Sequence, residues 1–205
     1  MKLSKIVGRI VNQPEVYGES DMVYLVNEIE INEKRIPVVY PEPLSSIVDT
    51  ADRVELFGYI KTDRDERLFT YFYALNALAV DESVEDVDEV IIEGFVRRAD
   101  GIVITRQGIP VYPFIVVCNQ GDGKKSVIHC AGFGSIAYEL NSLNLVSRES
   151  KIRCSCTIDL LGTALQLNVQ KIIFHTFYKR DNDFDYNEEG RDEYVGEVQE
   201  LDNVV

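Results

Sequence analysis

The sequence lacks tryptophan, long apolar runs and cysteines at the spacing typical of zinc sites. No apolar run approaches the roughly 20 residues that a membrane span needs, and the first residues lead into a strand pattern without the apolar core of a signal peptide. The four cysteines do not show the Cys-x2–4-Cys spacing typical of zinc sites, which favours a reducing compartment and buried, unpaired thiols. These absences predict a cytoplasmic protein with no membrane contact and no bound metal.

Residue patterns typical of catalysis are also missing. His129 and Cys130 are adjacent, so on a strand they would point to opposite faces and could not act together as base and nucleophile. The acidic run Asp63-Arg64-Asp65-Glu66 resembles a metal loop only superficially, because arginines interrupt and flank it. No glycine-rich phosphate loop occurs. We therefore expect a protein that is not an enzyme and has no cofactor.

Charge is distributed unevenly along the chain, whose net charge is −14. Residues 94–175 carry nine basic and five acidic side chains, a net charge of +4, whereas residues 1–80 (−4), 81–93 (−7) and 176–205 (−7) are all acidic. The local field decides whether a groove attracts phosphate. A nucleic-acid site is therefore expected in the basic segment.

Hydrophobic alternation divides the chain into two similar units. Each shows three strand patterns, a short helical pattern and further strand patterns, the element order of a five-stranded OB barrel. The first unit has strand patterns at 5–11, 23–31, 35–40, 54–60 and 68–80, with a helix candidate at 44–51. The second has strand patterns around 94–97, 114–119, 128–134 and 152–157, with a helix candidate near 137–140.

The predicted fold is therefore all-β with short helices: two tandem OB-fold five-stranded barrels plus an acidic C-terminal tail. The expected boundaries are a first OB-fold at 1–80, an acidic linker at 81–89, a second OB-fold at 90–176 and an acidic, flexible tail at 177–205. The tail is too polar to offset its ordering entropy by burying apolar surface.

Alternation in the second unit indicates a binding face. If the apolar residues around Gly94 face the interior, Phe95 and Arg97 project outward, as do His129 and Phe133 on the third strand. Aromatic rings beside cations on neighbouring strands suit single-strand binding, which needs stacking surfaces and phosphate contacts. Phe114 is expected in the core. Further candidate cations are Arg98, Arg106, Lys124, Lys125, Lys151 and Arg153.

Three local motifs resemble the bacterial and phage-type single-stranded-DNA-binding protein family. These are Thr105-x-x-Gly108, Phe114-x4-Asn119 and the Phe133-Gly134-x-x-Ala137-x-x-Leu140 run. The resemblance implies that Phe133 stacks on a base, and that Arg9 takes the DNA-facing position of the first unit. It also implies a homodimer with four barrels, and an acidic tail that recruits replication or repair proteins.

Two departures from that family stand out. The stacking tryptophans are absent, so stacking would rest on Phe and Tyr, and the chain ends Leu201-Asp202-Asn203-Val204-Val205 without the usual Pro-Phe end. We predict binding of single-stranded DNA with little sequence specificity, in DNA replication, recombination or repair. The alternatives are a primosome-like or scaffold OB protein that mainly contacts protein, and an OB domain for RNA or oligosaccharide.

Overall fold

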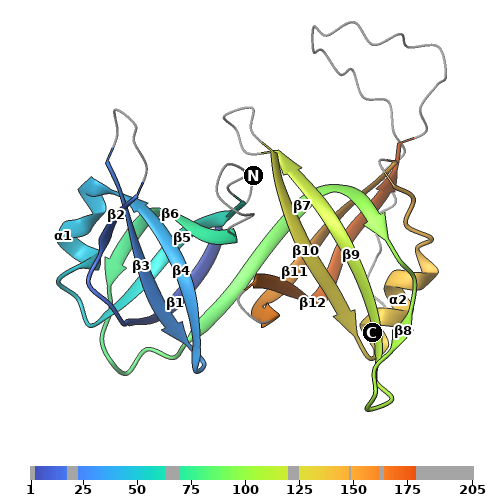
Figure 1. The fold of residues 1–205 in the computed structure, drawn as a ribbon, viewed down its shortest axis with the longest axis horizontal. Helices are drawn as coiled ribbons and strands as arrows, with labels where there is room; N and C mark the ends of the chain where they lie inside the picture. Colours follow the sequence, from blue (N-terminus) through green and yellow to red (C-terminus); the bar gives the residue numbers. More distant parts are fainter. Residues whose placement is uncertain are drawn as a thin grey trace, which may run out of the picture.

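The computed structural model describes residues 3–17, 23–62, 70–119, 125–147, 149–161 and 164–178. These residues form two β-barrels side by side, with short helical segments at the outer ends (Figure 1). The predicted all-β class with short helices is confirmed.

The first barrel closes in the strand order of an OB fold. Its strands are β1 (Ser4–Ile10), β3 (Tyr24–Ile31), β4 (Lys34–Pro41), β5 (Arg53–Thr62) and β6 (Thr70–Ala79). Strand β1 pairs with β3 on one side and with β5 on the other, and the circuit runs β1-β3-β4-β6-β5. Short strand β2 (Glu15–Tyr17) extends β3, and η1 (Glu42–Leu44) and α1 (Ser45–Val48) follow β4.

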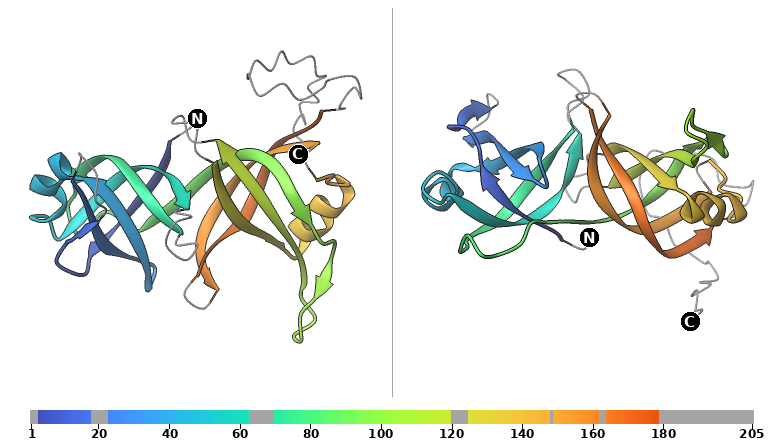
Figure 2. Two further views of the ribbon diagram at one scale, coloured as in Figure 1. Left: turned by 45° about the horizontal axis from the view of Figure 1, so that its top comes forward. Right: turned by 90° about the horizontal axis from the view of Figure 1, so that it is seen from below.

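The second barrel repeats this circuit. Its elements are β7 (Val87–Ala99), β8 (Val103–Ile104), β9 (Pro110–Asn119), β10 (Lys125–Phe133), α2 (Ser135–Ser142), β11 (Ser150–Leu161) and β12 (Ala164–Phe177). The order is β7-β9-β10-β12-β11, and β11 closes on β7 (Figure 2). The two tandem five-stranded OB barrels predicted from the sequence are therefore confirmed.

A glycine occupies the same position in the first strand of each barrel. A Cβ at Gly8 would lie 2.4 Å from the carbonyl oxygen of Glu30 on β3, and one at Gly94 would lie 2.4 Å from that of Val117 on β9. In both barrels the first strand therefore crosses the second too closely for any side chain. This equivalence supports the two-unit interpretation of the sequence.

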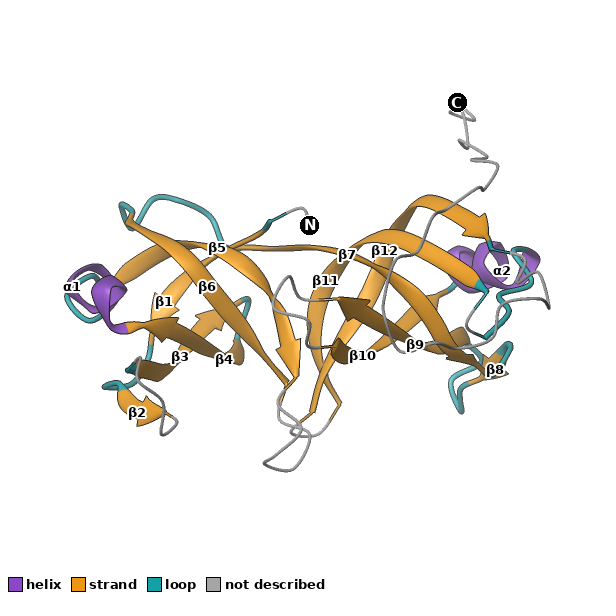
Figure 3. Ribbon diagram, turned by 90° about the horizontal axis from the view of Figure 1, so that it is seen from above, coloured by secondary structure: helices purple, strands orange, loops and turns teal. Residues whose placement is uncertain are grey.

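The barrels are joined by strand pairing as well as by the chain. β7 begins antiparallel to β1, with Lys5 opposite Glu89 and Val7 opposite Val87, before it enters the second barrel (Figure 3). Further hydrogen bonds cross the junction, from Ile91 N to Ser4 Oγ at 3.1 Å and from Lys34 Nζ to the Ile158 carbonyl at 2.9 Å. Both barrels thus share a fixed interface.

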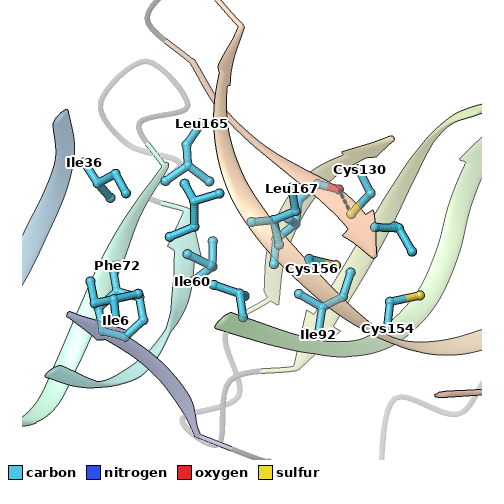
Figure 4. Packing of buried hydrophobic residues seen from close by; sticks show 14 of the residues in the cluster. Ile6, Ile36, Ile60, Phe72, Ile92, Cys130, Cys154, Cys156, Leu165 and Leu167 are labelled. Carbon is cyan, nitrogen blue, oxygen red and sulfur yellow. Dashed lines mark hydrogen bonds between the residues drawn. The ribbon is translucent and has the colours of Figure 1, made fainter. Parts of the chain in front are cut away.

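Buried side chains of the two barrels belong to one apolar cluster. It includes Phe72 of the first barrel and Cys130, Cys154 and Cys156 of the second (Figure 4). Phe114, expected in the core, is 2% exposed. The alternation along the strands thus places the apolar set inside, as predicted.

The acidic joint is held against the first barrel. Strand β7 starts at Val87, inside the expected 81–89 linker, and Asp86 accepts a hydrogen bond from Asn32 N at 2.6 Å and pairs with Arg53. Its carboxylate thus contacts two residues of the first barrel. The domain boundaries stay predictions, and the tail beyond Tyr178 lies outside the described residues.

Candidate nucleic-acid interface

The outer face of β9 and β10 is an apolar platform. Ladder pairing sets Val117 opposite Val127, Ile115 opposite His129 and Val111 opposite Phe133. The residues between them, such as Val116 and Ile128, point inward and are buried. The platform therefore follows from strict alternation on two paired strands. We refer to this surface, with the outward residues of β7, as the β7–β9–β10 face.

A β-bulge sets the cations at the β7 border of this face. Phe95 pairs with Val117, but Arg98 rather than Arg97 pairs with Ile115, because the register shifts between Val96 and Arg98. A bulge leaves one residue unpaired and re-aims its neighbours. Both arginines are exposed, and Arg98 occupies the position opposite Ile115 that regular pairing would give to Arg97.

The two predicted stacking rings differ in their surroundings. Phe133 is 39% exposed at the end of β10. Phe95 is half-buried, and its ring lies 5.4 Å from that of Tyr178, tilted by 57°. The backbone of Tyr178 is held by a 2.8 Å hydrogen bond from its N–H to the Glu149 carbonyl. Phe133 is therefore the more accessible ring, and Tyr178 partly covers Phe95.

Several predicted cations lie around the platform. Lys125 begins β10 opposite Asn119, and exposed His129 lies in the middle of that strand. Arg106 lies in the turn between β8 and β9, where the Thr105 N–H bonds to the Ile109 carbonyl at 2.9 Å. The Arg98 Nε lies 2.6 Å from the Asp100 carboxylate, so part of its charge is neutralised.

Lys151 and Arg153 lie beside this face, where Lys151 is the ladder neighbour of Phe95, but both are paired with a carboxylate. Both lie on β11 and pair with Glu93, Lys151 at 2.8 Å and Arg153 through Nε at 2.8 Å; the Arg153 guanidinium also lies 4.8 Å from the Phe174 ring centroid. Burial alone would raise the pKa of Glu93, but hydrogen bonds from the two cations outweigh it and lower that pKa. Their ability to attract phosphate is correspondingly reduced.

Two predicted residues fall outside this group. Arg9 lies on β1 of the first barrel, between Glu30 of β3 and Arg53 of β5, so it belongs to a different surface. Lys124 lies outside the described residues. The structure thus gathers Phe95, Arg97, Arg98, Arg106, Lys125, His129 and Phe133 on or around one face, with Lys151 and Arg153 at its β11 border.

Sequence reasoning missed the floor of this face. Ile115 and Val117 of β9 lie between the residues of β7 and β10, and Val111 lies between β8 and Phe133 of β10. The signal was available, because an inward Phe114 implies outward neighbours at odd positions. Tyr178 gave no comparable signal, since its contact with Phe95 depends on where the chain leaves β12.

The structure offers little chemistry for metal or thiol reactions. Among the described residues, no three His, Cys, Asp or Glu side chains gather as a possible metal site. Burial raises the pKa of Cys154 and Cys156 above the usual thiol range, so both remain protonated and unreactive. Within the same part of the chain, no helix has the length and apolar character of a membrane span.

Comparison with known proteins identifies the architecture. No protein-family model and no curated protein sequence matches the chain. A deletion mutant of the single-stranded DNA binding protein from Thermus aquaticus superposes with a TM-score of 0.67 at 11% identity, covering 92% of this chain and 98% of that one. The wild-type protein gives 0.62 at 10% identity, over 95% and 97% of the two chains. The chain therefore shares the tandem-barrel fold of the Thermus aquaticus protein over nearly the full length of both.

Proposed function

We propose that this protein binds single-stranded DNA on the β7–β9–β10 face, with little sequence preference and without enzymatic activity. The observation that carries the proposal is the combination on one face of an accessible ring at Phe133, an apolar floor and a border of cations. Bases stack on such rings and cations contact the phosphates. The proteins that share the fold are themselves described as single-stranded DNA binding proteins.

Little sequence preference follows from the kind of groups present. The floor at Val111, Ile115 and Val117 offers only side-chain methyl groups, which do not distinguish bases by hydrogen bonds. Stacking on Phe133 is available to every base because each has a π face. Discrimination against duplex DNA follows as well, since paired bases cannot reach the ring.

Fluorescence anisotropy with labelled oligo-dT and a matching duplex, over a series of salt concentrations, tests this function. We expect binding to the single strand alone, weakening with salt by a slope of about −0.7 per phosphate neutralised. Labelled oligo-U in the same series measures the preference for DNA over RNA. No binding to the single strand at low salt would contradict the proposal.

Protein contact is the second candidate, and the first barrel supplies its supporting observation. The outer side of β3 carries Glu28 and Glu30, whereas Leu75 and Leu78 of β6 are 46% and 48% exposed. A barrel surface that carries both exposed apolar residues and outward carboxylates suits a protein partner better than a phosphate chain. In the anisotropy series this role predicts no salt-sensitive binding of DNA.

We further propose a role in DNA replication, recombination or repair, with the acidic tail as the segment that binds other proteins. A homodimer would bring four barrels together. Sedimentation of the full chain with and without oligo-dT measures this state: a dimer mass supports the assembly, and a monomer mass at high concentration contradicts it.

A further inference from the structure

The first barrel carries a cluster of tyrosines beside a lysine. The Tyr73 ring of β6 lies 5.4 Å from that of Tyr59 on β5 and 6.0 Å from that of Tyr24 on β3, with tilts of 45° and 59°. The Lys61 Nζ lies 5.2 Å from the Tyr73 ring centroid. Aromatic surface next to a cation is the same combination that distinguishes the β7–β9–β10 face.

The cluster lies on the outer surface of the barrel. Phe72 and Ala74, which flank Tyr73, are fully buried, so the side chain between them points outward. Likewise Ile60, next to Tyr59, is 4% exposed. All three tyrosines are half-buried, as expected for rings that lie against the sheet and offer one side to solvent.

This surface continues into the second barrel. Thr62 at the end of β5 donates its N–H to Ser126 Oγ at 2.9 Å and its hydroxyl to the Val127 carbonyl of β10 at 2.9 Å. Lys61 directly precedes Thr62 in the sequence, and Lys125 directly precedes Ser126. β5 and β10 therefore meet at their ends, midway between the barrels (Figures 1 and 3).

We propose that Tyr24, Tyr59, Tyr73 and Lys61 form a second stacking site for the same single strand, which continues from the β7–β9–β10 face across the Thr62–Ser126 contact. The inference rests on the proposed function and extends it to the first barrel. Bases stack on the tyrosines, and Lys61 with Lys125 contacts the phosphates that cross the junction.

The outward row of β3 begins at Tyr24 and continues to Glu28 and Glu30, so charge favours a path from Tyr24 toward β6 and β5 over one along β3. There Glu28 and Glu30 project outward, and Arg35 lies 3.9 Å from the Glu30 carboxylate, so that side offers phosphates little net attraction. The path over β5 and β6 instead has Lys61 at its entrance. In the first barrel the strand thus crosses β3 at Tyr24 and then follows β6 and β5, whereas in the second it follows β7, β9 and β10.

Oligonucleotide length separates the two sites. An OB fold covers about 4–16 nucleotides, so a strand of about 10 fits one barrel and a strand of about 30 can reach both. In the full chain, a double substitution Tyr59→Ala and Tyr73→Ala should weaken binding of the longer strand about tenfold and leave the shorter one unchanged. Tyr138→Ala removes a 58% exposed tyrosine on α2 and is the matched control.

The outcomes are distinct. If the longer strand binds the double variant as tightly as it binds the wild type, the second site is wrong. Weaker binding of both the longer and the shorter strand also contradicts it. If wild-type protein binds neither strand, the proposed function itself fails. If binding of the short strand depends on Phe133 but the longer strand binds no more tightly, only the second site fails.

Cross-linking of the unmodified protein keeps the test independent of folding in the variants. Irradiation with an iodouracil-substituted longer strand should link to Tyr59 or Tyr73, and the shorter strand should link mainly to the second barrel. Cross-links from the longer strand confined to residues 87–178 would overturn the proposal.

Discussion

Phe133 ends β10 with its ring partly open to solvent and its backbone paired to Val111. Because the ring contributes little to the core, Phe133→Ala should leave the fold intact and weaken binding of oligo-dT by about 1–3 kcal/mol. Phe133→Tyr keeps an aromatic face and should bind nearly as the wild type. Equal affinities of the alanine variant and the wild type, by anisotropy, would mean that bases stack elsewhere.

Glu93 decides how strongly Lys151 and Arg153 attract DNA. Both cations are paired to its carboxylate, and Lys151 is the ladder neighbour of Phe95. In Glu93→Gln the carboxylate charge is gone, so oligo-dT should bind more tightly at low salt and the salt dependence should steepen. Glu139→Gln, an exposed change on α2, controls for net charge. An unchanged salt slope in Glu93→Gln would place these cations outside the interface.

Glu93 also links stability to pH. Its pKa is lower in the folded than in the unfolded protein, so the unfolded chain binds a proton more readily. The stabilisation is therefore complete above the ordinary carboxyl pKa and is lost as the pH falls through the lower folded value. Urea unfolding across the acidic range should show a shallower pH dependence for Glu93→Gln than for the wild type.

β7 depends on Gly94 to close the second barrel. An added Cβ would lie 2.4 Å from the Val117 carbonyl oxygen and 2.7 Å from Val116 Cγ1, and the backbone cannot yield cheaply. Gly94→Ala should therefore cost about 1–3 kcal/mol of stability or more. Gly101→Ala, where a Cβ meets nothing within 4 Å but φ is +77°, shows the cost of left-handed backbone strain without a clash. Equal unfolding midpoints for Gly94→Ala and the wild type would contradict this steric account.

Regular strands were predictable from the sequence, and the irregularities in them were not. Alternation correctly put Phe114 inside and Phe95, His129 and Phe133 outside, because a strand repeats every two residues. The bulge that brings Arg98 opposite Ile115 depends on pairing with β9, which no local pattern encodes. For the same reason the pairing of Lys151 and Arg153 with Glu93 was missed: it joins side chains on separate strands.

The arrangement of the whole molecule was the least predictable part. Two OB units followed from the repeated pattern, but the pairing of Lys5 with Glu89 required a contact between strands of different barrels. The acidic composition of 81–89 suggested a linker, whereas Asp86 holds Asn32 and Arg53. Composition thus indicated the charge of this stretch but not its contacts with Asn32 and Arg53, which are set by the tertiary fold.

The described chain ends at Tyr178, against Phe95 and thus beside the proposed interface. Residues 179–205 carry three basic and ten acidic side chains. Their removal should tighten binding of oligo-dT at low salt, because repulsion between carboxylates and phosphates is lost, and the difference should shrink as salt screens it. Anisotropy of the truncated and full chains measures this. Equal affinities at low salt would show that the tail charge does not act at the interface.

The β1–β7 ladder has a mechanical consequence. Since β7 runs from its pairing with β1 directly into the second barrel, no slack chain separates the two barrels. We expect a nucleic-acid strand under tension to load this ladder along its length, so that its hydrogen bonds resist together. In a single-molecule pulling experiment the protein would then extend as one stiff body. It would lack the initial low-force extension of two domains joined by a flexible linker.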